Sequence, residues 1–191
     1  MGQNQLYPIF LKVSQLNVLI VGGGKVAAEK LTFLLKSSPN ANVLLISLYF
    51  DKEVLELAKT YNVTTVKTSY NKTVLKNKQL IIAATNKSQV NKQIYNDAKA
   101  ENILINVADT PELCDFYLGG IVSKGNIKIG ISTNGKSPTL AKRLRQFFED
   151  LIPENIDDLA ENLNTYRKTI KGDFSNKVVK LNELTKTLLI K

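Results

Sequence analysis

The sequence predicts an α/β fold: a Rossmann-like, doubly wound parallel sheet, followed by a small β-hairpin and a helical dimerisation region. Three observations lead to this prediction. Up to Asp109, short apolar runs rich in β-branched residues alternate with segments of helical periodicity, which is typical of a parallel sheet covered on both faces. A glycine turn, Gly22–Gly24, joins the first strand to the first helix. Beyond Asp109, two short strands flank a tight turn, and only helices follow.

The elements of the first half are predicted from apolar spacing. Asn17–Gly22 is an apolar run that indicates a buried strand, and Val26, Leu31, Leu34 and Leu35 follow it at helical spacing. Four more strands are expected, at residues 43–47, 63–67, 80–84 and 103–107, with helices after a capping Asp51 and from about Ser88 to Glu101.

In the second half, short apolar runs predict strands at 116–123 and 127–132, joined by a tight turn at Lys124-Gly-Asn126. Ser137 and Pro138 suit the N-cap and first position of a helix that runs through Leu151, and beyond Pro153 we expect helix to the end. We therefore expect a dinucleotide-binding domain at 1–113, a hairpin-and-helix segment at 114–150 and a helical region at 151–191. The last two have little core of their own, which a second copy would supply.

Composition excludes several kinds of chemistry. The 191 residues include no His and one Cys, Cys114. Catalytic Ser-His-Asp and Cys-His pairs, His-based zinc sites, internal disulfides and cysteine-held clusters are therefore excluded, and no resident metal site is expected. The longest apolar runs are far shorter than the roughly 20 residues that span a bilayer, and residues 1–7 do not resemble a signal peptide. We expect a cytoplasmic protein that binds no membrane.

The net charge of +9 raises the hypothesis of nucleic-acid binding, but it rests on charge alone, because no nucleic-acid motif or basic tail is present. The densest stretch without acidic residues holds Lys136, Lys142, Arg143 and Arg145, with two of the three arginines of the chain. Such a basic segment suits phosphate or carboxylate recognition. A solvated helix face is an equally open interpretation of it.

Gly22-x-Gly24-x-x-Ala27 has the spacing of a dinucleotide-binding turn. There the first glycine permits the tight turn, the second lets the backbone approach the pyrophosphate, and the helix N-terminus attracts the phosphates. A turn needed only for packing is the alternative. The acidic residue usual at the end of the second strand is replaced by Ser47-Leu48-Tyr49, and Asp51 and Lys52 follow. The choice between NAD and NADP stays open, with NAD favoured.

Two further motifs end strands that should reach the same edge of the sheet. In Ala83-Ala-Thr-Asn86 the small residues leave room for a cofactor, and Thr85 can hydrogen-bond it or cap the next helix. In Asn106-Val-Ala-Asp109 the carboxylate is the leading candidate for acid/base work in a chain without His, and a turn or cap role is the alternative.

Together, several motifs resemble the precorrin-2 dehydrogenase/sirohydrochlorin ferrochelatase part of siroheme synthases, in that family's order and over residues 7 to about 150. They are Tyr7-Pro-Ile-Phe-Leu11, residues 21–30, 83–86 and 106–109, Cys114-Asp-Phe-Tyr117, and residues 131–143. The resemblance implies NAD-dependent oxidation of precorrin-2 to sirohydrochlorin by a homodimer, and it leaves open Fe²⁺ insertion to give siroheme. The methyltransferase domain of longer siroheme synthases is expected to be absent.

The resemblance also assigns dimerisation and the substrate cleft to segment 114–150, and it implies roles for individual residues. Asp109 matches the catalytic aspartate, and Asn106 is expected to bind the substrate. The cofactor is expected to lie against Gly22, Gly24, Lys25, Val26, Ser47, Leu48, Tyr49 and Thr85, and the tetrapyrrole against Ser132, Thr133, Lys136, Ser137 and Arg143. A tetrapyrrole with many carboxylates would suit the basic segment. The alternative function is a non-catalytic NAD-binding regulatory module, which needs the glycine turn but neither Asp109 nor residues 132–143.

Overall fold

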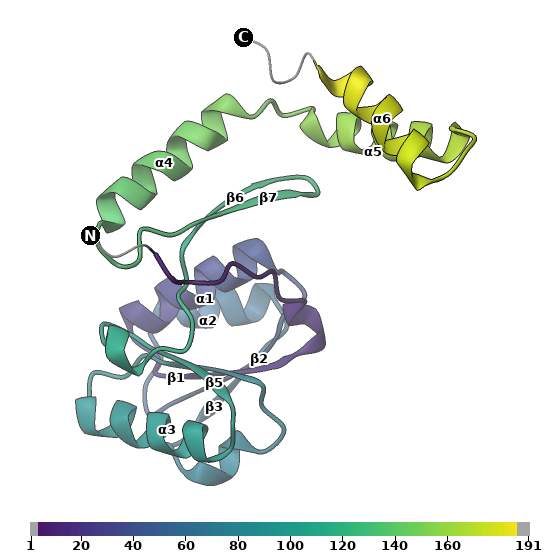
Figure 1. The fold of residues 1–191 in the computed structure, drawn as a ribbon. Coiled ribbons are helices and arrows are strands. Elements are labelled where there is room, and N and C mark those ends of the chain that lie inside the picture. Colours follow the sequence, from purple (N-terminus) through teal and green to yellow (C-terminus); the bar gives the residue numbers. More distant parts are fainter. Residues whose placement is uncertain (1–3, 187–191) are drawn as a thin grey trace. The chain divides into compact units, whose positions relative to one another are not determined.

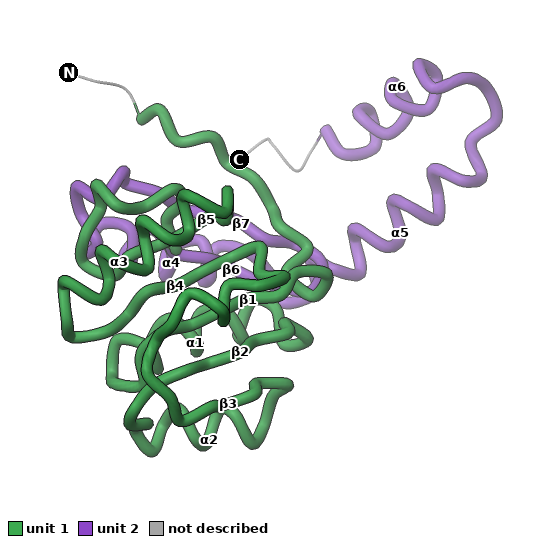
Figure 2. The backbone as a smooth tube through the Cα atoms, turned by 90° about the horizontal axis from the view of Figure 1, so that it is seen from below, with its two compact units in different colours: residues 1–119 green, residues 120–191 purple. Residues whose placement is uncertain are grey.

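The computed structural model describes residues 4–186, which divide into two compact units: unit 1, up to Gly119, and unit 2, from Gly120 (Figure 2). The expected divisions after residues 113 and 150 remain predictions. Within the described residues, no helix is long and apolar enough to cross a membrane.

Unit 1 contains a parallel five-stranded sheet with the strand order β3-β2-β1-β4-β5, whose strands are all labelled in Figure 2. The strands are β1 (Asn17–Val21), β2 (Asn42–Ser47), β3 (Val63–Lys67), β4 (Leu80–Ala83) and β5 (Leu104–Val107). The helices are α1 (Lys25–Ser37), α2 (Lys52–Thr60) and α3 (Ser88–Ala100), with 3₁₀ turns η1 (Val13–Gln15), η2 (Lys72–Leu75) and η3 (Pro111–Leu113). The predicted fold class is confirmed.

The strands alternate their side chains between two apolar layers. Val18 and Ile20 of β1 pack with α1 and α2 on one face, whereas Leu19 and Val21 pack with α3 on the other. Figure 1 shows α1 and α2 on one side of the sheet and α3 on the other. Because the chain crosses between faces after β3, the strand order reverses between β1 and β4, which is where open α/β sheets bind ligands.

Unit 2 begins with an antiparallel hairpin of β6 (Gly120–Lys124) and β7 (Ile127–Ile131). The helices α4 (Pro138–Leu151), α5 (Ile156–Thr169) and α6 (Phe174–Thr185) follow. As predicted, Ser137 caps α4: its Oγ accepts a hydrogen bond from the Leu140 N–H, at 3.2 Å. The hairpin turn is held by α5, because the Asn126 N–H donates to Asp157 Oδ1 at 2.8 Å.

Two predictions about this region are wrong. Residues 116–119 are not part of the hairpin, because the Phe116 carbonyl accepts a hydrogen bond from the Asn106 side chain and Phe116 and Leu118 pack on the core of unit 1. The helix after Pro153 is not continuous either. The first helix, α5, ends at Thr169; Gly172 follows with a φ of 114°, and α6 begins after its N-cap, Asp173. Residues 187–191 of that predicted helix lie outside the described residues.

Candidate dinucleotide site and Asp109 turn

The sheet register brings the predicted cofactor motifs of unit 1 to one edge. Ile46, Val21, Ala83 and Val107 form one row across β2, β1, β4 and β5. Each is the last or next-to-last residue of its strand, so the segments that follow them all leave the sheet at its carboxyl edge. This edge therefore carries the glycine turn, Ser47–Tyr49, Thr85 and Asp109.

Gly22 and Gly23 are required by close packing. Gly22 has a φ of 126°, and a Cβ there would lie 2.6 Å from the Ala84 carbonyl carbon. A Cβ at Gly23 would overlap the Tyr49 carbonyl oxygen and lie 2.9 Å from the Phe50 ring. The Asp51 N–H donates to the Gly23 carbonyl at 2.7 Å, which joins this turn to the start of α2. The spacing of the dinucleotide-binding motif leaves Gly23 without a role, although the run of three glycines is a signal for it.

Gly24 differs from its two neighbours, because a Cβ there would meet nothing within 4 Å. It is the N-cap of α1 and has no side chain to bond the first-turn N–H groups, and that turn carries no acidic residue. Lys25 and Val26, the first residues of α1, are exposed. An open helix N-terminus of this kind suits phosphate oxygens, so these residues fit the pyrophosphate of a dinucleotide.

The end of β2 offers an apolar and hydroxyl-bearing surface. Leu48 and Tyr49 are exposed, while Ser47 is half-buried and its Oγ accepts from the Tyr49 N–H at 3.3 Å. Asp51 begins α2 without a side-chain cap bond, and Lys52 forms an exposed ion pair with Glu56 at 3.6 Å. Leu48 and Tyr49 lie where the ribose of a dinucleotide would be expected.

Thr85 follows β4, and its hydroxyl is used within the chain. Its Oγ1 donates to Asn91 Oδ1 at 2.6 Å, and the Asn91 Nδ2 donates back to the Thr85 carbonyl at 3.0 Å. Asn91, on the first turns of α3, is buried. The hydroxyl therefore bonds a side chain of α3 and does not cap that helix, whose N-cap is Lys87 and lacks a side-chain cap bond. The place of Thr85 beside the glycine turn follows from the Ala84 N–H bond to the Val21 carbonyl.

Asp109 lies in a tight turn directly after β5. The Thr110 N–H donates to the Val107 carbonyl at 3.3 Å, and Asp109 has a φ of 58°. Asp tolerates this left-handed conformation better than most residues. The Ala108 N–H donates to the Ala83 carbonyl at 2.9 Å, so the turn begins beside the end of β4. Asp109 is exposed, and a carboxylate there can meet a ligand at this edge. Asn106 is buried, and its amide faces inward to Phe116.

Apart from Asn106, the expected substrate residues belong to unit 2, where a loop leads from β7 into α4. Thr133 Oγ1 donates to the Ser137 carbonyl at 3.1 Å, and the Ser132 Oγ accepts from the Asn134 N–H at 3.1 Å. Lys136 is exposed at the tip. On α4, exposed Arg143 donates to the Gln146 side chain at 3.2 Å, and Arg145 forms an ion pair with Glu149.

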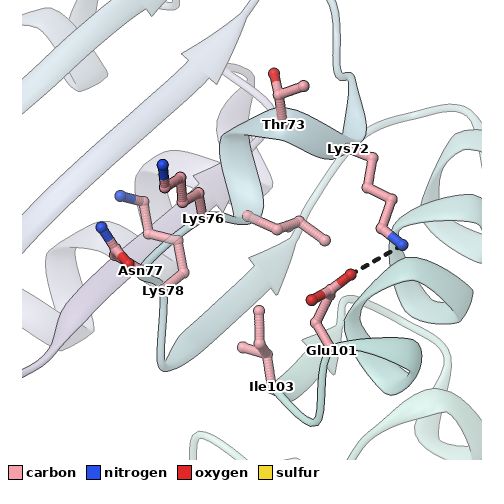
Figure 3. A pocket seen from close by; sticks show the side chains of 8 residues that line it. Lys72, Thr73, Lys76, Asn77, Lys78, Glu101 and Ile103 are labelled. Atoms are coloured by element: carbon pink, nitrogen blue, oxygen red, sulfur yellow. Dashed lines mark ion pairs between the residues drawn. The ribbon is translucent and has the colours of Figure 1, made fainter.

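A pocket lies at the other edge of the sheet of unit 1, near the amino ends of β4 and β5 (Figure 3). An ion pair between Lys72 and Glu101, at 2.9 Å, lies on its rim. The pocket is lined by Lys72, Thr73, Leu75, Lys76, Asn77, Lys78, Glu101 and Ile103. None of the predicted site residues lines this pocket. Among the described residues, no group of three or more His, Cys, Asp or Glu side chains could hold a metal ion.

Residues 9–120 match the protein-family model described as "Putative NAD(P)-binding". The chain belongs to this NAD(P)-binding family. Residues 124–151 match a second model, "Sirohaem biosynthesis protein central". Both matches confirm the resemblance stated from the motifs.

Individual similar proteins support this family assignment. A siroheme synthase of Psychrobacter arcticus is 42% identical over 87% of this chain, and one of Pseudoalteromonas translucida is 40% identical over 90%. The chain spans about a third of the length of these relatives, 30% and 36%. A solved structure titled "SirC, precorrin-2 dehydrogenase" covers 97% of this chain and 94% of its own, with a TM-score of 0.73 and 23% identity. It shows the same fold.

Proposed function

We propose that this NAD(P)-binding chain is a precorrin-2 dehydrogenase that uses NAD to make sirohydrochlorin. The observation that carries the proposal is the shared carboxyl edge, where the open N-cap Gly24 and the exposed carboxylate of Asp109 follow strands separated only by β4. The siroheme synthase relatives and the second family match support precorrin-2 as the substrate.

In the proposed reaction, precorrin-2 loses two hydrogens, one as a hydride and one as a proton. NAD, when bound, accepts the hydride and leaves as NADH. The α1 N-terminus and the backbone at Gly24 hold the dinucleotide phosphates, while Leu48 and Tyr49 lie beside its ribose. The Asp109 carboxylate accepts the ring proton and releases it to water. Atoms and electrons balance as precorrin-2 plus NAD⁺ giving sirohydrochlorin, NADH and H⁺.

The decisive experiment incubates the purified chain with precorrin-2 and NAD, and follows NADH absorbance together with the visible spectrum of the tetrapyrrole. We expect both signals to rise together. Parallel reactions with NADP test the cofactor preference, for which we expect NAD to be the better substrate. If neither nucleotide is reduced while NAD still binds, the chain is the regulatory module considered above instead.

Iron insertion is a second proposed activity of the same site. When Fe²⁺ enters sirohydrochlorin as a substrate, two pyrrole N–H protons must leave. In this proposal the Asp109 carboxylate accepts them one at a time and releases each to water. Loss of siroheme formation on replacing Asp109, in an anaerobic assay with sirohydrochlorin and Fe²⁺, would support this role.

We also propose that the basic segment on α4 and its preceding loop attracts the tetrapyrrole carboxylates. Lys136→Ala and Arg143→Ala should each raise the KM for precorrin-2 roughly fivefold, equivalent to about 1 kcal/mol for an exposed charge pair, with kcat retained. The KM of these variants should also depend less steeply on salt. Lys180→Ala, which removes an exposed charge from α6 of the same unit, is the matched control. Equal KM values for all three variants and the unaltered chain would remove this segment from the substrate site.

Burial within unit 2 supports the proposal of a homodimer. Among residues 120–186, only Val122 and Ile170 are buried. On α4, Leu140, Phe147 and Leu151 are each at least half exposed, and a lone two-stranded hairpin is marginally stable in water. A second copy covering these side chains would double the mass measured in solution.

The cytoplasmic location expected from the sequence stays a prediction.

A further inference from the structure

The segment Cys114–Phe116 runs beside β5 and is held there largely by side chains. The Asp115 N–H donates to the Ile105 carbonyl at 2.8 Å, and the Ile105 N–H donates to Asp115 Oδ2 at 3.1 Å. The buried Asn106 amide donates to the Phe116 carbonyl at 2.8 Å. The chain that leaves β5 through Asp109 is therefore returned to the same strand a few residues later.

Cys114 contacts both ends of the Asp109 turn, which we define as Val107–Thr110. Its Sγ lies 3.2 Å from the Val107 carbonyl oxygen and 3.4 Å from that of Thr110. The Val107 N–H donates to the same Sγ at 3.3 Å. Burial raises the pKa of the Cys114 thiol above its usual value, so at neutral pH the thiol keeps the proton that it donates.

The Asp109 carboxylate depends on this turn for its position. Within residues 4–186, no other side chain is hydrogen-bonded to it, and it is exposed rather than packed. The direction of the side chain is set by the backbone of Asp109, which is in the left-handed region. That conformation is unfavourable for most residues, so surrounding contacts must stabilise it. Cys114 supplies such contacts from the inner side of the turn.

We propose that Cys114 is a positioning residue for Asp109. It acts through the N–H···S bond that it accepts from Val107 and through its single S–H, which the Val107 and Thr110 carbonyls share. This inference rests on the proposed role of Asp109 in precorrin-2 oxidation. It also explains the Cys114-Asp-Phe-Tyr117 motif. Asp115 and Asn106 hold the returning segment against β5, and Cys114, on that segment, contacts the Asp109 turn and limits its movement.

The test measures steady-state oxidation of precorrin-2 by Cys114→Ala and Cys114→Ser, each made in the unaltered chain and in Asp109→Asn. Cys114→Ala should lower kcat roughly tenfold, because small misplacements of a catalytic group are costly, and it should leave the KM for NAD unchanged. Cys114→Ser keeps an O–H donor and should recover most of the rate. In the Asp109→Asn background, Cys114→Ala should cause no further loss. An equal loss in both backgrounds would overturn the proposal.

Amide hydrogen exchange gives a second readout that does not need the proposed reaction. Cys114→Ala should speed exchange at Val107 and Thr110, whereas Cys114→Ser should leave it slow. Tyr70→Phe is the control, because it removes a 2.9 Å hydrogen bond from Tyr70 to Asp97 that has no part in this turn. Unchanged exchange in Cys114→Ala would refute the positioning role even if no oxidation of precorrin-2 were found, in which case the proposed function alone would have failed.

Discussion

Asp109→Asn is expected to lower the kcat for precorrin-2 oxidation by roughly 10²- to 10⁴-fold, the range for loss of a positioned general base. Asn is the informative replacement because, like Asp, it tolerates the left-handed backbone found here, where φ is 58°. Ala would add backbone strain to the chemical loss. The measurement is NADH formation at saturating precorrin-2 and NAD, together with the free energy of unfolding, which should change little.

Glu112→Gln is the matched control for Asp109→Asn. Glu112 is an exposed carboxylate in η3, close in sequence but outside the Asp109 turn. Its loss changes the local charge equally and should leave kcat near that of the unaltered chain. A wild-type kcat in Asp109→Asn would remove Asp109 from the oxidation, and similar losses in both variants would indicate a general effect of charge.

Gly22→Ala is expected to lower the free energy of unfolding by at least about 3 kcal/mol, because it combines a strained φ with a backbone clash. The added Cβ would overlap the Ala84 carbonyl group, and neither backbone can move without disturbing the pairing of β1 with β4. Since domains are stable by only about 5–15 kcal/mol, we expect a poor yield of folded protein. Urea denaturation measures the effect.

Gly24→Ala is the control that separates folding from cofactor binding. Gly24 has a φ of −90°, and a Cβ there enters open space. The free energy of unfolding should therefore fall by no more than about 1 kcal/mol, as for a weaker N-cap. NAD affinity should fall roughly tenfold, or about 1.4 kcal/mol, because the methyl group occupies the space through which the pyrophosphate approaches. If Gly24→Ala bound NAD normally, the phosphates would have to lie elsewhere.

Local patterns were sufficient for most elements of the fold. The apolar run of β1, the glycine turn and the spacing of Leu31, Leu34 and Leu35 predicted strand, turn and helix because burial on one face imposes a period on the sequence. The Ser137-Pro138 pair likewise predicted the start of α4, since capping uses atoms a few residues apart. The error at 116–119 arose where a distant side chain, Asn106, holds the backbone.

Composition and short-range spacing are enough to predict the order of strands and helices, the exclusion of His chemistry and the candidates Gly24 and Asp109. The folded chain was needed to show that Ile46, Val21, Ala83 and Val107 share one row, and that Cys114 contacts both ends of the Asp109 turn. Strand pairing and side-chain bonds to a returning segment depend on closure of the chain in space, which leaves no period in the sequence.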